Sequence, residues 1–407
     1  MHVKGNPVEY LERLLPRLAF ISTPRIAHAV QTVMITLANR SYRWSDALNN
    51  ILDTVLNILP LLPSIKELAF HSVHFSHSNL TLLQQISPSS IKLRFPTFDI
   101  EDKNPLPFRI RVKSLNCLDD LPLERIQTNS QFLSCFIQSS YLQTLIFGST
   151  HAERLLTTLL TSEHPFSQLL ELDMPVDVMT YQNAIPALFK CTKVESLRLR
   201  YSTQVPERYL KVIPPDILPN LSSFDGPHYY ASLLAQDRRL HDVALRPFDN
   251  FSTTRDAKCI LRTLQELGPD VETLDILAVT DISSFLPTLL TFKSLRKLSI
   301  NSHPEFYAKC LSPCEITSKL SVTSLPPALE MLSIGVQMRN HKGRVARDTK
   351  DIVEKITASS PLLKELKLWY WTHPQPAWIV WNRSSEGVND GVTLNKASLD
   401  CSLEKGS

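Results

Sequence analysis

Few of the residues best suited to chemistry stand at a useful spacing in this chain. Cys310 and Cys314 lie four residues apart in KCLSPCE, which could form half of a zinc site. No second pair of Cys or His follows at a matching spacing, so inert thiols on a helix face are the simpler interpretation. His71, His74 and His77 gather in HSVHFSH, and we interpret them as exposed loop residues. We therefore expect no bound metal.

Nucleotide-binding and catalytic motifs are also missing from the sequence. No Gly-x-Gly-x-x-Gly, Gly-x-x-x-x-Gly-Lys-Ser/Thr, His-Glu-x-x-His or Gly-x-Ser-x-Gly occurs. The chain of 407 residues has only 9 glycines, about 2% against a typical 7%, and a phosphate-binding loop usually needs several. We expect no cofactor, no catalytic residues and no enzymatic activity. An enzyme built on a repeat framework stays as a remote alternative.

The charge balance does not favour a polyanionic partner. Lys and Arg number 43 and Asp and Glu 40, which gives a net charge of +3. The loop 338–348 is basic at Arg339, Lys342, Arg344 and Arg347, but a lone basic loop is more often a solvated insertion. We therefore predict no nucleic-acid binding.

Targeting signals and membrane spans are not evident either. The first residues, MHVKGNPVEYLERLLPRL, contain no apolar run of the signal-peptide kind. The most apolar segment, 51–65, is short and is interrupted by Asp53, Pro60 and Pro63. The 7 cysteines are odd in number and irregular in spacing, which is not typical of a disulfide framework. We predict a cytoplasmic or nuclear protein without membrane contact.

A short phrase recurs along the chain and organises it. VESLRL at 194–199 is similar to IKELAF at 65–70, VETLDI at 271–276 and LKELKL at 363–368. With the fourth residue of each copy as an anchor, the mean spacing is about 28 residues, within the range of repeat proteins. The predicted anchors are Val33, Leu68, Leu93, Leu115, Leu145, Leu172, Leu197, Phe224, Val243, Leu274, Leu298, Leu332 and Leu366.

The spacing of apolar residues differs between the recurring phrase and the segments that separate its copies. Apolar and polar residues alternate around each anchor, which predicts a short strand with one buried face. Segments 45–59, 151–164, 253–268 and 348–360 place apolar residues three and four apart, which predicts amphipathic helices. A proline often precedes the next strand, as at Pro63, Pro219, Pro327 and Pro361. The sequence therefore predicts an α/β solenoid in which stacked units share one core between a parallel sheet and a row of helices.

With this recurrence, the chain resembles an irregular leucine-rich-repeat protein, most closely the repeat portion of divergent fungal F-box proteins. The resemblance covers residues 30–371. It implies a horseshoe with parallel strands on its concave face and helices on its convex face. PVEYLERLLPRL at 7–18 resembles part of an F-box, but no complete F-box is visible. We divide the chain into an N-terminal helical cap or F-box remnant (1–29), a solenoid (30–383) and a disordered C-terminal tail (384–407).

In such an architecture, side chains that flank the anchors would face a partner. They are acidic around Leu172, basic around Leu197, acidic around Leu274 and basic from Lys297, and mixed signs suit a protein surface better than a polyanion. The residues we expect to bind protein are Asp173, Arg198, Arg200, Asp275, Lys297, Lys367 and Trp369.

Two possible functions follow from these observations. The first is a protein-interaction module, and the resemblance implies an F-box-type substrate receptor that also binds a cullin-ligase adaptor. The second is a scaffold protein without ligase function. We expect a monomer in either case. The aromatic segment 368–381, which carries Trp369, Trp371, Trp378 and Trp381, could anchor a partner or close the open end of the repeat core, and we favour the second.

Overall fold

The structure of the protein is a computed structural model. It describes residues 7–36, 46–94, 96–98, 109–117, 133–148, 152–180, 182–200, 213–236, 238–246, 253–277, 286–301, 325–337, 353–371, 377–383 and 391–394. The chain forms two compact units, unit 1 from Met1 to Asn220 and unit 2 from Leu221 to Ser407.

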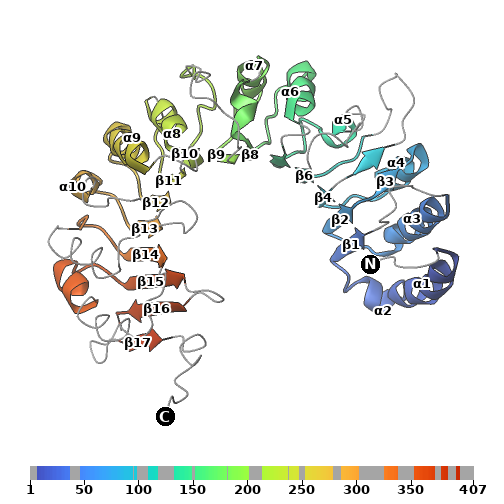
Figure 1. Ribbon diagram of the computed structural model, residues 1–407. Helices are drawn as coiled ribbons and strands as arrows, with labels where there is room; N and C mark the ends of the chain where they lie inside the picture. Colours follow the sequence, from blue (N-terminus) through green and yellow to red (C-terminus); the bar gives the residue numbers. More distant parts are fainter. Residues whose placement is uncertain are drawn as a thin grey trace, which may run out of the picture. The chain divides into compact units, whose positions relative to one another are not determined.

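Unit 1 alternates helices with the strands of a parallel sheet (Figure 1). The sheet has the strand order β1-β2-β4-β6-β7-β8-β9, and each neighbouring pair is parallel. Its strands are β1 Thr32–Thr36, β2 Glu67–His71, β4 Ser90–Arg94, β6 Ser114–Cys117, β7 Thr144–Phe147, β8 Glu171–Pro175 and β9 Ser196–Arg200. A separate parallel pair joins β3 His74–Phe75 to β5 Thr97–Phe98. The helices are α1 Pro7–Ile21, α2 Pro24–Ala27, α3 Asp46–Ile58, η1 Leu59–Leu61, α4 His77–Gln84, α5 Leu133–Phe136, α6 Ala152–Thr161, η5 Val176–Thr180 and α7 Ala184–Leu188.

Unit 2 repeats this alternation and ends in antiparallel strands. Its sheet runs from β10 to β17 in chain order, parallel as far as β15 and antiparallel for the last two pairs. Its strands are β10 Ser223–Pro227, β11 Asp242–Arg246, β12 Thr273–Leu277, β13 Lys297–Asn301, β14 Met331–Gln337, β15 Glu365–Trp371, β16 Ala377–Asn382 and β17 Gly391–Leu394. The helices are α8 His228–Ala235, α9 Thr253–Glu266 and α10 Leu286–Leu289, and residues 353–359 are also helical. The predicted helices at 45–59, 151–164 and 253–268 are thereby confirmed, and the one at 348–360 is confirmed over the described residues 353–359.

The anchors stand opposite one another across the strands. In unit 1, Val33 pairs with Leu68, Leu115 with Leu145, and Leu145 with Leu172 in turn. In unit 2 the aligned row consists of Phe224, Val243, Leu274, Leu298, Leu332 and Leu366. From Leu68 onward every aligned anchor is at most 2% exposed. Each copy of the recurring phrase therefore contributes one aligned anchor residue to the core, as the sequence predicts.

The predicted anchor Leu93 is wrong by two residues. Leu68 on β2 pairs with Ile91 on β4, and Ile91 in turn pairs with Leu115, whereas Leu93 lies opposite Phe70. Both Ile91 and Leu93 are buried, because a shift of two residues along a strand keeps a side chain on the same face. The alternation in SIKLRF thus gave the correct face but not the register.

The prolines that precede the strands sit in tight turns. Pro63, Pro327 and Pro361 each occupy the second position of a turn. The turns are closed by hydrogen bonds from Ile65 N to Leu62 O, Leu329 N to Pro326 O, and Leu363 N to Ser360 O. Proline is favoured there because its fixed φ matches a type I or type II turn. Each turn brings the chain back to the sheet at a constant distance from the next anchor, which holds the anchors in line.

The helices cover one side of the sheet in each unit. In Figure 1, α3, α4, α6 and α7 lie along one side of the strands of unit 1, and α8, α9 and α10 do so in unit 2. The anchors, except the half-buried Val33, and the residues two positions after them are buried and point toward this side. The residues between them are half-buried or exposed, except Ala69, which is buried. The prediction of an α/β protein with a mostly parallel sheet is confirmed. We call the opposite side of the sheet its open face.

Strand β16 covers the edge of the last parallel strand, β15, and β17 pairs in turn with β16. β16 pairs with β15 in antiparallel register, and Trp381 stands opposite Leu366 and is buried. The guanidinium of Arg383 lies 5.6 Å from the centre of the Trp381 ring. Trp381 thus extends the apolar core past the last anchor, as expected of a closing segment. Gly391–Leu394, within the tail predicted to be disordered, form β17 and pair with β16, so order reaches into that tail.

Candidate protein-binding surface

The open face of unit 2 carries three aligned rows of side chains. The first row, which immediately precedes the anchors, consists of Ser223, Asp242, Thr273, Lys297, Met331 and Glu365. The second row, which immediately follows the anchors, consists of Asp225, Ala244, Asp275, Ser299, Ser333 and Lys367. The third row lies two residues further along and includes Arg246, Asn301 and Gly335. Because the strands are aligned without stagger, these rows run straight across the sheet.

A hollow of about 270 Å³ lies on this face across β12, β13, β14 and β15. Its lining includes Ser299 and Ser333, the two short side chains between Asp275 and Lys367 in the second row. Lys297 and Met331 of the first row form another part of its lining. The hollow therefore results from two small residues set among longer ones.

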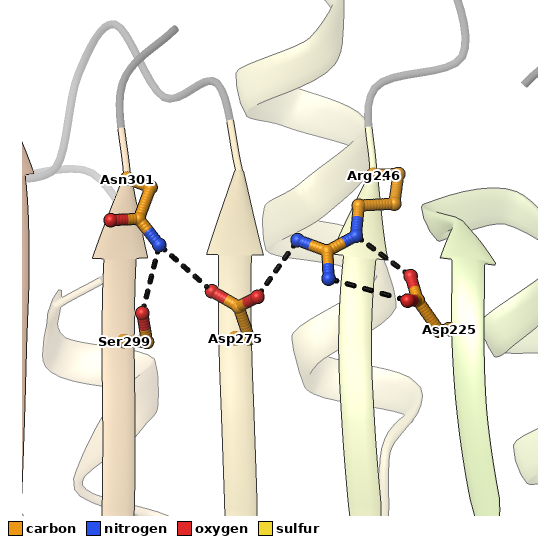
Figure 2. A network of polar contacts seen from close by, with 5 residues as sticks. All are labelled: Asp225, Arg246, Asp275, Ser299 and Asn301. Carbon is orange, nitrogen blue, oxygen red and sulfur yellow. Dashed lines mark hydrogen bonds and ion pairs between the residues drawn. The ribbon is translucent and has the colours of Figure 1, made fainter. Parts of the chain in front are cut away.

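A polar cluster borders the hollow at β10–β13 (Figure 2). Arg246 donates from Nε to Asp225 Oδ1 at 2.7 Å and from Nη1 to Asp275 Oδ2 at 2.8 Å. Asn301 Nδ2 then donates to Asp275 Oδ1 at 3.2 Å and to Ser299 Oγ at 2.8 Å. The bonds link four neighbouring strands, and the side chains of Arg246, Asp225 and Asp275 are only 26–27% exposed.

The charges in this cluster are arranged to stabilise one another. Partial burial alone would lower the pKa of Arg246, but its hydrogen bonds to Asp225 and the charges of Asp275 and Asp225 raise the pKa above its usual value. One guanidinium serves two carboxylates, each on a strand beside β11. Charge-assisted bonds of this kind fix the direction of a side chain as well as its charge. Asp275 is thus held in a defined position at the edge of the hollow.

The same bond recurs at equivalent positions, and we call it the Asp clasp. In a clasp, the third residue after one anchor donates to an Asp that immediately follows the anchor of the preceding strand. The clasps are Arg200 to Asp173, Arg246 to Asp225, and Asn301 to Asp275. In unit 1 the Arg200 Nε–Asp173 Oδ1 distance is 2.5 Å, and Arg200 also donates to the carbonyl of Phe147. The clasp ties adjacent strands together on the side of the sheet that the helices leave open.

The structure separates the predicted binding residues into two groups. Asp173 and Arg200 bond to each other on β8 and β9 of unit 1, where Arg198 is exposed. Asp275, Lys297 and Lys367 all line the hollow of unit 2. Trp369 lies on β15 opposite Gly335, but its side chain is outside the described residues. The alternating signs predicted along the face are therefore partly neutralised within the protein by the clasps.

Several members of this surface are not among the predicted binding residues, including Asp225, Arg246 and Ser333. A signal for Arg246 does exist, because VALR at 243–246 places Arg at the same offset as LRLR at 197–200. Asp225 lies in LSSFDG, a weak copy of the repeated phrase. Ser333 is an ordinary strand residue in LEMLSI, and only its position between β13 and β15 makes it part of a hollow.

The other residues suited to chemistry lie in unit 1 or outside the described ranges. No group of three or more His, Cys, Asp or Glu side chains within them could hold a metal ion. His71 lies on β2, His74 begins β3 and His77 begins α4. Cys310, Cys314 and the basic loop 338–348 lie outside the residues that the structure describes. None of the described helices has the length and apolar character needed to cross a bilayer.

The fold and this face define the class of the protein only broadly, as an α/β repeat protein with a mostly parallel sheet. Neither models of known protein families nor curated protein sequences match the chain.

Proposed function

We propose that this chain is a leucine-rich-repeat protein whose concave, open face binds a protein partner. The observation that carries the proposal is the hollow across β12–β15, which brings Asp275, Lys297 and Lys367 together on a face that the helices leave uncovered. Protein interfaces favour a desolvated centre with a polar rim. Both signs of charge are present around this hollow, which suits a protein better than a polyanion.

The proposal is tested by capturing partners from a native extract with the full chain. The informative variants are Arg198→Glu on the open face of unit 1 and Lys297→Glu on that of unit 2, both at exposed positions. Lys258→Glu on α9 is the matched control, because Lys258 is also exposed but lies on a helix. We expect one or both face variants to lose proteins that the wild type and Lys258→Glu retain. Identical capture by all four proteins would refute the proposal.

A narrower proposal is that the captured protein is the substrate of a ubiquitin ligase. Two large apolar side chains of α1 support it, since Leu15 is 49% and Phe20 is 63% exposed. A cullin-ligase adaptor that packs against α1 would cover them, as the resemblance to F-box proteins implies. Co-purification of such an adaptor with the wild type, and its loss from a Leu15→Asp, Phe20→Asp variant, would support this function. Partner capture without an adaptor would favour a scaffold protein instead.

A further inference from the structure

The hollow across β12–β15 points to a particular kind of partner segment. We infer that it receives one apolar side chain of an extended peptide, and that an acidic residue close by in that peptide pairs with Lys297. The inference rests on the proposed function, since it names which part of the open face a protein partner contacts and which chemistry that partner presents.

The size of the hollow favours a single side chain. Sites for small molecules and cofactors usually enclose about 300–1,000 Å³, whereas this hollow measures about 270 Å³. It is also only partly enclosed, so a small molecule bound there would stay exposed on one side. One Leu, Met or Phe side chain of a bound peptide would fill much of it.

The lining of the hollow favours an apolar side chain. Met331 contributes a flexible thioether that adapts to the shape of its neighbour. Lys297 and Lys367 contribute the aliphatic parts of their side chains, which can cover apolar groups while the ammonium stays in water. The surface of the hollow is accordingly formed mostly by carbon.

Three of the four charged residues around the hollow are already engaged. Asp275 accepts from Arg246 and Asn301. Lys367 and Glu365 form an ion pair with 2.6 Å between Nζ and Oε1. These contacts hold three parts of the rim in place before a partner arrives, and a rim fixed in advance lowers the entropy lost on binding.

Lys297 is the exception. It is exposed and makes no ion pair with another described residue. Glu330, whose pKa is lowered first by its hydrogen bond to Lys364 and only weakly by Lys297, pairs with Lys364 and Arg296 instead. Lys297 is therefore the one charged residue of the lining whose ammonium no described carboxylate pairs with, and it complements a carboxylate on the partner.

An extended peptide can present both groups at once. Side chains two residues apart lie on the same side of an extended segment, about 7 Å from one another. That spacing is within reach of the long Lys297 side chain, which lines the same hollow that would hold the apolar residue. The expected pattern in the partner is thus an apolar residue with Asp or Glu two positions away.

A library of random peptides displayed on phage tests this inference with the full chain as bait. We expect the selected peptides to share a large apolar residue with an acidic residue nearby. Binding of a selected peptide is then measured by fluorescence polarisation. Lys297→Glu should weaken it about tenfold, because an attraction becomes a repulsion. Ser333→Trp, which fills the hollow, should weaken it by about tenfold or more, because the apolar side chain loses its site.

Two controls accompany these variants. Lys293→Glu makes the same charge change at an exposed position that does not line the hollow, and Ser223→Trp adds the same bulk to the first row on β10. Both should bind the peptide as the wild type does, and thermal melting checks that Ser333→Trp is folded. If Ser333→Trp is unfolded, Lys297→Glu and Lys293→Glu still decide the outcome.

Three results would overturn the inference. They are selection of basic peptides, selection of no peptide, and binding that Lys297→Glu leaves unchanged. None of them would by itself remove the proposed function, because capture of proteins from a native extract by the open face is measured independently. If the open-face variants captured the same proteins as the wild type and Lys258→Glu, the proposed function would be refuted, whatever peptides are selected.

Discussion

The guanidinium of Arg246 on β11 is bonded to the carboxylate of Asp225 on β10, with 2.7 Å between Nε and Oδ1. Arg200 on β9 and Asp173 on β8 have the same relationship at the same positions of the repeat. The same pair of side chains thus links neighbouring strands in both units, on the face opposite the described helices.

Arg246→Ala should lower the free energy of unfolding by about 1–3 kcal/mol, because it leaves the partly buried Asp225 and Asp275 close together without their shared cation. The measurement is a urea titration of the full chain. Arg239→Ala is the control, since Arg239 is 86% exposed and lies 3.9 Å from Asp270, and such surface pairs contribute about 0–1 kcal/mol. If Arg246→Ala and Arg239→Ala lower the free energy of unfolding equally, the clasp does not stabilise the protein more than a surface ion pair does.

Gly335→Ala should destabilise unit 2 although only one carbon is added. A Cβ on Gly335 would lie 2.2 Å from Oδ1 of Asn301, far inside contact distance, and such overpacking typically costs about 1–3 kcal/mol. Gly268→Ala is the control, because a Cβ there meets nothing within 4 Å. Adding Asn301→Ala to Gly335→Ala should restore part of the loss. A Gly335→Ala protein as stable as the Gly268→Ala protein would contradict this account.

Stability should fall as the pH drops from 6.5 toward 4 because of His228. Burial lowers the pKa of His228 in the folded protein to about 4 from 6.5. In this window the unfolded chain binds a proton that the folded chain does not, so each pH unit removes up to about 1.4 kcal/mol of stability as the pH falls. Unfolding of the wild type and of His228→Gln should be compared at several pH values. The difference in unfolding free energy between the wild type and His228→Gln should shrink or reverse in acid. If the two free energies change with pH in parallel, His228 does not have this role.

Trp381→Ala should destabilise the protein by about 3–5 kcal/mol, the usual effect of removing a large buried side chain. Trp381 stands opposite Leu366 and covers the end of the anchor row. Leu362→Ala is the control, since Leu362 is 56% exposed. If both variants melt at the same temperature, β16 does not close the core.

The anchor rows could be read from the sequence because they depend on local patterns. An alternation of period two identifies a strand face, and a proline turn before the strand sets where the anchor falls. Leu93 shows where this fails, because Ile91 and Leu93 are both apolar and both face the core. The choice between them depends on the pairing of β4 with β2 and β6, which no local pattern contains.

The clasps and the hollow could not be predicted from the sequence, although some of their residues were. Asp173 and Arg200 were both predicted to face a partner, yet their bond depends on the register of β8 and β9. Arg246 and Asp275 are 29 positions apart in the chain and meet only because β11 and β12 are aligned. A hollow is likewise a property of neighbouring strands, since Ser299 and Ser333 are small only relative to Asp275, Lys297 and Lys367 beside them.

Hydrogen exchange of the full chain, with and without a protein captured from native extract, tests the central claim most directly. The account predicts slower exchange on binding in β12–β15, at residues 273–277, 297–301, 331–337 and 365–371, with little change in α9. Protection confined to the helices, with the strands that line the hollow unchanged, would contradict it.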